Sequence, residues 1–138
     1  MARKKLVVGN WKMNLNSAQA RALAVELTGR PFGQVDVAVC PAFVHLNLVA
    51  DALRGHEVSW GAQNAYHQPD GAFTGEVSIP MLRDLGCRFV IVGHSERRQI
   101  FGETDSLINK KVLAAHANEL KPILCVGETL EEREDGTA

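Results

Sequence analysis

The amino-acid sequence predicts an α/β fold in which parallel strands alternate with covering helices. Short apolar runs rich in β-branched residues recur along the chain, and segments with the helical spacing of apolar residues separate most of them. This alternation is typical of a parallel sheet. The 138 residues, of which 46% are hydrophobic and 22% charged, have the composition of one ordinary globular domain, 1–138. The predicted strands cover residues 6–8, 35–39, 58–62, 89–92 and 123–126.

Two predicted helices carry an apolar stripe with the spacing i, i+3, i+4, i+7, which marks one face of a helix. The first helix follows strand 6–8, with Ser17 as its N-cap and Gly29 as its end, and the second ends before Gly55. Both stripes are expected to face the sheet. Their members are Ala20, Leu23, Ala24 and Leu27 in the first helix and Leu46, Val49, Ala50 and Leu53 in the second.

Hydroxyl side chains mark the start of the next two helices. Ser78, followed by Pro80, begins a short helix, and Thr104 caps a longer one. In the longer helix we expect Lys110 and Lys111 to occupy polar positions. Its apolar stripe consists of Ile108, Val112 and Ala115.

The segment 64–75 differs from the rest of the chain because it contains glycine, proline and histidine without periodicity. It is long for a connection within a compact domain. The sequence therefore predicts a functional or interface loop, with a mobile surface loop as the alternative.

The last helix signal lies close to the final residue. Thr129 and Glu132 have the spacing of a capping box, yet the sequence stops soon afterwards at Ala138. Because an isolated helix that short is marginal in water, we expect further sequence to follow Ala138 and the fold to be a partial barrel.

The overall composition argues against several classes of function. A net charge of −1 gives no bulk attraction to nucleic acid or to an anionic membrane, so neither is expected as a partner. The N-terminus lacks the apolar core of a signal peptide, and no run of about 18 apolar residues occurs, which predicts a cytoplasmic protein. Cys40, Cys87 and Cys125 lie far apart without metal-ligand spacing, so we expect buried, reduced thiols, no disulfide and no metal.

Polar residues follow several of the predicted strands, which is where α/β proteins place functional groups. Asn10 and Lys12 follow the first strand, Gln63–Asn64 the third and His94 the fourth. Because the strands are parallel, these residues are expected to meet at one rim. Glu128 follows the fifth strand and is either a rim carboxylate or a neighbour of the next helix cap.

His94 is the residue of this rim with the clearest chemical potential. It stands where the strand 89–92 gives way to a helix that begins near Ser95. The positive end of a helix favours a neutral imidazole, which can donate a hydrogen bond and polarise a carbonyl. A histidine that merely caps the helix is an equally good interpretation of the position.

Lys12 and Glu96 form the second part of the predicted site. Lys12 supplies a compact positive charge suited to a phosphate or a developing oxyanion, although a lone lysine here would more often be a solvated surface residue. Glu96 could pair with Lys12 and fix its ammonium in place, or could simply be a first-turn glutamate that the helix favours.

Two other pairs of residues fit structural roles better than functional ones. Arg97 and Arg98 could clamp an anion, but arginines just inside a helix are more often partners in surface ion pairs. Trp11 and Trp60 are expected to fill core or interface volume rather than to stack on a ligand.

Five short motifs, in this order, resemble those of the triosephosphate isomerase family. They span most of the chain and are highly specific in combination, but they match only the first five of the family's eight strands. The motifs are Gly9–Asn14, Gly61–Asn64, Gly71–Glu76, Gly93–Arg98 and Leu124–Glu128.

The resemblance implies a partial (β/α)8 TIM barrel and an isomerase that interconverts dihydroxyacetone phosphate and glyceraldehyde 3-phosphate without metal or organic cofactor. His94 matches the family's electrophile, a histidine that acts in its neutral form. Asn10 and Lys12 match positions that contact the oxygens of the triose phosphate substrate. Glu96 matches the carboxylate that accompanies the histidine, and Ser95 the hydroxyl beside it.

The resemblance also implies a homo-oligomer, and it defines what the sequence lacks. In the family the loop matching 64–76 inserts into a neighbouring subunit, with the threonine that matches Thr74 reaching that subunit's site. The family's glutamate base, closing lid and glycine-rich phosphate grip belong to strands six to eight, outside these 138 residues. The chain alone is therefore expected to be inactive.

Two further interpretations stay open on the sequence alone. One is a non-catalytic half-barrel that self-associates through the exposed edges at its first and fifth strands. The other is an unrelated anion-binding module that uses Lys12 and the start of the helix at Ser95.

Overall fold

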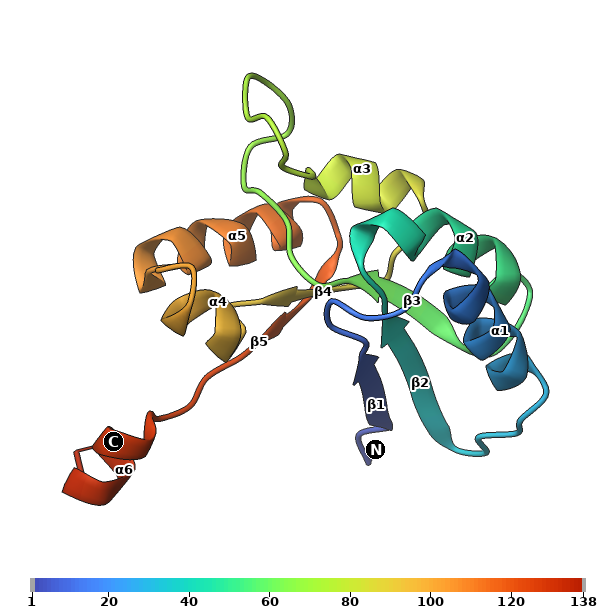
Figure 1. Ribbon diagram of the computed structural model, residues 1–138, viewed down its shortest axis with the longest axis horizontal. Coiled ribbons are helices and arrows are strands. Elements are labelled where there is room, and N and C mark those ends of the chain that lie inside the picture. Colours follow the sequence, from blue (N-terminus) through green and yellow to red (C-terminus); the bar gives the residue numbers. More distant parts are fainter. Residues whose placement is uncertain (1, 138) are drawn as a thin grey trace.

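The computed structural model describes residues 2–137 of the chain. Its centre is one sheet of five parallel strands in the order β1-β2-β3-β4-β5, so each strand pairs with its neighbour in the sequence. The sheet is curled, and its strands alternate with helices along the chain (Figure 1). The prediction of a partial (β/α)8 barrel is confirmed. The strands are β1 (Lys5–Asn10), β2 (Val35–Cys40), β3 (Ser59–Ala62), β4 (Phe89–Val92) and β5 (Lys121–Leu124).

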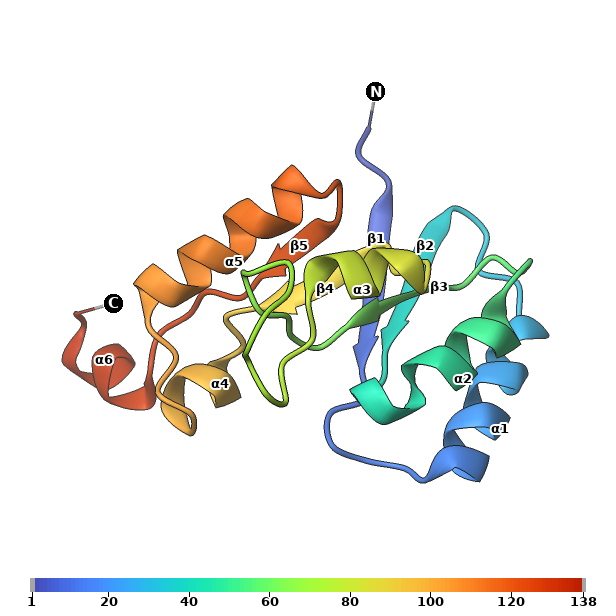
Figure 2. The same cartoon turned by 90° about the horizontal axis from the view of Figure 1, so that it is seen from above.

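The longer helices lie on one face of the curled sheet, as Figure 2 shows from above. A short helix, α4, follows β4 directly and precedes the longer α5, while α6 stands apart from the sheet at the end of an extended segment (Figure 1). The helices are α1 (Ser17–Thr28), α2 (Phe43–Leu53), α3 (Ile79–Asp84), α4 (Ser95–Gln99), α5 (Asp105–Ala117) and α6 (Leu130–Asp135).

Side-chain caps fix the start of most helices. Ser78 and Thr104 accept hydrogen bonds from backbone N–H groups of α3 and α5, and Thr129 forms the capping box of α6, as the sequence predicted. The predicted cap of α1 was wrong by one residue. Asn16, not Ser17, caps this helix. The Asn16 side chain accepts a hydrogen bond from the Gln19 backbone N–H, and the Gln19 side chain accepts one from the Asn16 backbone N–H.

The predicted bounds of the fifth strand were also wrong, by two residues at each end. Residues of β5 pair with β4 from Lys121 opposite Phe89 to Leu124 opposite Val92, where β4 ends. Pro122 lies within the strand rather than before it. This is tolerated because β5 is an edge strand, where a missing backbone N–H breaks no second ladder.

Buried side chains form two apolar clusters between the sheet and its helices. One joins α2, α3 and α5 to β3 and β4, and the other joins α1 and α2 to β2 and β3. The predicted stripes lie mainly in these clusters, with Ala20, Ala24, Val49 and Leu53 fully buried. In contrast, Val7 on the edge strand β1 is largely exposed, which is consistent with the predicted open edges at β1 and β5.

Candidate functional site

The loop after β1 holds Lys12 in an unusual backbone conformation. Lys12 has a φ of 56°, in the left-handed region that non-glycine residues rarely adopt. Its N–H donates to the Asn10 side chain at 3.0 Å, and its carbonyl accepts from Gln63 Nε2 at 2.9 Å. Gln63 also donates to the Cys40 carbonyl at 2.8 Å. The ends of β1, β2 and β3 therefore act together to fix the backbone of Lys12.

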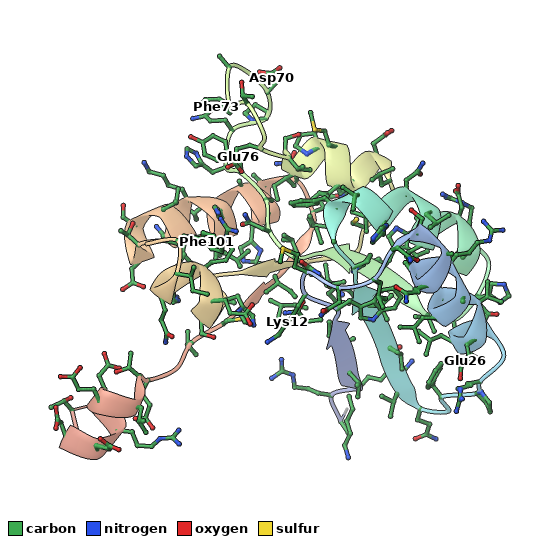
Figure 3. All side chains as sticks on the ribbon, viewed as in Figure 1. Lys12, Glu26, Asp70, Phe73, Glu76 and Phe101 are labelled. Carbon is green, nitrogen blue, oxygen red and sulfur yellow. The ribbon has the colours of Figure 1, made fainter. Side chains whose placement is uncertain are left out.

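The Lys12 ammonium pairs with Glu96 of α4, as the sequence suggested. Lys12 Nζ lies 2.6 Å from Glu96 Oε1, although the two residues are 84 positions apart in the chain. Figure 3 shows Lys12 beyond the end of β1, on the side of the sheet towards α4. The hydrogen bond from Lys12 holds the pKa of Glu96 below its usual value. With side-chain exposures of 51% and 44%, both groups are accessible from solvent.

His94 caps α4 through one of its two ring nitrogens. Its Nδ1 accepts from the Glu96 backbone N–H at 3.1 Å. Glu96 Oε2 lies farther from Nδ1, at 3.5 Å. Because a backbone N–H can only donate, the bond from Glu96 N–H places the proton of the neutral ring on Nε2. The two interpretations of His94, helix cap and electrophile, are therefore compatible: the cap selects the tautomer whose Nε2–H can donate.

Ser95 is the exposed first residue of α4, next to His94. The two arginines that follow have structural partners. Arg97 pairs with the buried Glu103, and Arg98 pairs with Asp105 and donates to the Gly93 carbonyl at 2.8 Å. These contacts favour the structural interpretation of both arginines.

A cleft of about 490 Å³ opens beside His94. One wall comes from the residues around the start of α4, and the other from the segment between β5 and α6, which includes Glu128. Glu128 itself pairs with Arg133 of α6. A larger hollow of about 610 Å³ lies at the other ends of α1 and α2, lined by residues 27–31 and 55–58, and contains none of the predicted site residues.

Asn64 follows the end of β3, as predicted, but it is not open to solvent there. Its side chain is buried and accepts from Lys111 Nζ at 2.8 Å. Lys111 was expected at a polar position of α5, but it is only 2% exposed and lies 3.1 Å from Glu103. Burial lowers the pKa of Lys111, an effect that Glu103 opposes. Lys111 is three residues after Ile108 and four before Ala115. Position 111 therefore lies on the same face of α5 as the apolar stripe, which the helical spacing could have indicated.

Thr74, the predicted interface residue, is exposed on a loop that projects from the molecule. Figure 3 shows this loop, with Asp70, Phe73 and Glu76, standing above α3 and α5. At its base the Tyr66 N–H donates to the Val77 carbonyl at 2.8 Å, and the Tyr66 and Phe73 rings pack at a tilt of 42° with centroids 4.6 Å apart. The loop is therefore shaped by its own contacts, while its tip stays open to solvent.

The cysteines are all free thiols in the described part of the chain, two of them buried and Cys125 only partly so. Burial raises the pKa of both Cys40 and Cys87 to about 12, which leaves them unreactive near neutral pH. Within residues 2–137, no group of three or more His, Cys, Asp or Glu side chains could hold a metal ion. The same residues include no helix that is long and apolar enough to span a membrane.

Comparison with known proteins agrees with the motifs. The family model described as "TIM: Triosephosphate isomerase" matches residues 5–138. The chain is similar to the triosephosphate isomerases of Moorella thermoacetica, at 54% identity, and of Rhodopirellula baltica, at 55%, in each case over 97% of this chain and 54% of the relative. A Roseiflexus relative of the same name is 54% identical over 99% of this chain and 54% of its own length. The chain thus spans about half the length of the curated relatives it matches.

Proposed function

The chain belongs to the triosephosphate isomerase family, and on that premise we propose that it provides the electrophilic half of an isomerase active site. The proposed reaction interconverts dihydroxyacetone phosphate and glyceraldehyde 3-phosphate. A base removes a proton from the carbon next to the carbonyl, giving an enediolate, and the proton returns to the neighbouring carbon. The single observation that carries this proposal is the meeting of Lys12, Glu96 and His94 at the ends of β1 and β4.

His94 and Lys12 have complementary parts in this proposal. The Nε2–H of His94 donates to the substrate carbonyl and stabilises the negative charge that develops on its oxygen. The Lys12 ammonium adds positive charge near both the enediolate and the phosphate, with Glu96 holding it in place. Asn10 contacts a substrate oxygen and, through its bond to the Lys12 N–H, supports the loop. Ser95 stands beside His94.

The glutamate base, the lid and the glycine-rich phosphate grip are expected from the part of the fold that follows strand five. A general base contributes about two to four powers of ten in rate, and lid closure and electrostatic stabilisation add to that. We therefore propose that these 138 residues alone do not turn over substrate. The proposed site also uses no metal and no organic cofactor.

Joining this chain to the remaining part of a relative's barrel is expected to produce isomerase activity. The partner half is the part of the Moorella thermoacetica relative that lies beyond the aligned region, fused after Ala138 or supplied as a separate polypeptide. Interconversion of the two triose phosphates is measured by a coupled assay. The chain alone, tested at the same concentration, is the control. Turnover by the chain alone, or a folded chimera without turnover, contradicts the proposal.

We also propose that the completed protein is a homo-oligomer in the cytoplasm. Association is supported by the projecting loop around Thr74, and a reducing compartment is supported by the three free thiols. Self-association of the 138 residues alone through the open edges at β1 and β5 is the competing interpretation.

The chimera is expected to sediment as a dimer whose stability depends on the projecting loop. Thr74→Arg places a long charged side chain on the loop and is expected to shift the chimera towards monomer, whereas Thr28→Arg at the end of α1 is not. Sedimentation velocity over a range of concentrations measures this shift. A chimera that is active and strictly monomeric contradicts the proposed assembly. Association of the chain alone that is lost in the chimera points to the sheet edges instead, because the added strands would cover them.

A further inference from the structure

The loop between β1 and α1 has a strained backbone at two places. Lys12 has a φ of 56° and Leu15 a φ of 75°, and they are two of the three non-glycine residues with positive φ in residues 2–137. Such conformations cost free energy and persist only where the surrounding structure holds them. The loop that carries Lys12 therefore needs an anchor at each of its two strained residues.

The anchors at Lys12 are the contacts with Asn10 and Gln63 described above, and the anchor at Leu15 is His45. The Leu15 carbonyl lies 2.8 Å from His45 Nε2, although the two residues are 30 positions apart. Because a carbonyl oxygen can only accept, His45 donates from Nε2. His45 is only 7% exposed, so this hydrogen bond is largely shielded from water.

His45 lies on α2, and within residues 2–137 its ring has no second hydrogen bond. It is the third residue of α2, and its backbone N–H donates to the Ala42 carbonyl at 3.0 Å. The adjoining Leu46 is buried in the core between α2 and the sheet. Within the described residues, His45 Nδ1 is buried and has no hydrogen-bond partner. Among the described residues, the bond to the Leu15 carbonyl is thus the one hydrogen bond that the His45 ring makes.

We propose that His45 is a positioning residue for Lys12. By holding the Leu15 carbonyl, it fixes the loop 11–16 in the conformation that brings the Lys12 ammonium to Glu96. The importance of this placement for turnover rests on the proposed function, but the placement itself can be measured without any turnover.

Titration of Glu96 in the 138-residue chain tests this inference, because the contact with Lys12 lowers the pKa of Glu96. His45→Phe keeps a ring and removes the donor, and His45→Gln keeps an N–H donor at the same number of bonds from Cα. Carbon-13 NMR of the Glu96 carboxyl is expected to show a higher pKa in His45→Phe, in the same direction as in Lys12→Met. In His45→Gln the pKa of Glu96 is expected to stay close to that of the wild type. An unchanged titration in folded His45→Phe overturns the proposal.

Two measurements keep the test decisive if a variant is destabilised. Amide hydrogen exchange of Ala50 and Val90 reports global stability. If the exchange rate of these amides rises together with the pKa of Glu96, and His45→Gln restores neither, the role of His45 is merely structural and the proposal is overturned. The nitrogen-15 spectrum of the wild-type ring is expected to show the Nε2–H tautomer, and the Nδ1–H tautomer overturns the proposal whatever the variants do. An inactive chimera, in contrast, contradicts the proposed function and leaves this result unaffected.

Discussion

In the completed chimera, His94→Asn is expected to lower kcat by about two to four powers of ten, the usual range for a positioned proton donor. Asparagine places an acceptor near the position of the histidine Nδ1, so the cap on the Glu96 N–H is kept. It cannot reach to the position of Nε2. The substitution therefore separates the two functions of His94, because it retains the helix cap and removes the proposed electrophile.

Steady-state kinetics and denaturant unfolding together check this prediction. Because the lost hydrogen bond strengthens as charge develops in the transition state, kcat and kcat/KM are expected to fall by similar factors. The free energy of unfolding is expected to stay within about 0.5 kcal/mol of the unsubstituted chimera, as for a preserved cap. Activity within about tenfold of the unsubstituted chimera contradicts the role given to Nε2–H.

Lys111→Met is expected to lower the free energy of unfolding of the chain by about 3 kcal/mol, which is typical of breaking a buried ion pair. Lys111 and Glu103 have side chains that are only 3% and 2% exposed, and Lys111 Nζ lies 3.1 Å from Glu103 Oε2. Arg97 also contacts that oxygen, at 2.7 Å, whereas the buried Glu103 Oε1 has no partner in the described residues. Removing the ammonium takes away one of the two cations at the buried Glu103 carboxylate and the donor to the buried Asn64 side chain.

The neighbouring residue provides a matched control for this substitution. Lys110 is exposed on the same helix, so Lys110→Met is expected to change stability by no more than about 0.5 kcal/mol. The double variant Lys111→Met, Glu103→Gln is expected to recover part of the loss, because it removes both buried charges. Equal urea midpoints for Lys110→Met and Lys111→Met contradict the importance of the buried pair.

Features of the fold that depend on nearby residues could be predicted from the sequence. The caps at Ser78, Thr104 and Thr129 follow from hydroxyl groups that reach backbone N–H groups three residues on. The apolar stripes of the first two helices follow from the period of the helix. In the site, the contact of Lys12 with Glu96 could be anticipated because parallel strands bring successive strand ends to one rim.

Features that depend on the packing of distant segments could not be predicted in this way. Lys111 is charged, so it was assigned to solvent, although Asn64 and Glu103 surround its ammonium in the structure. Gln63 was recognised as polar, but its bonds to two carbonyls of other segments require the register of β1, β2 and β3. The end of β5 is set by the end of β4, which no local pattern in residues 121–126 reveals.

The infrared spectrum of dihydroxyacetone phosphate bound to the chimera tests the central claim most directly, because hydrogen-bond donation to a carbonyl weakens its C=O bond. If the first five strands provide the electrophilic side of the site, the carbonyl stretch of the bound ketone will lie at lower frequency than that of the free ketone. His94→Asn will return it towards the free value. A bound carbonyl at the free frequency in the unsubstituted chimera, or an equal shift with and without His94, contradicts the account.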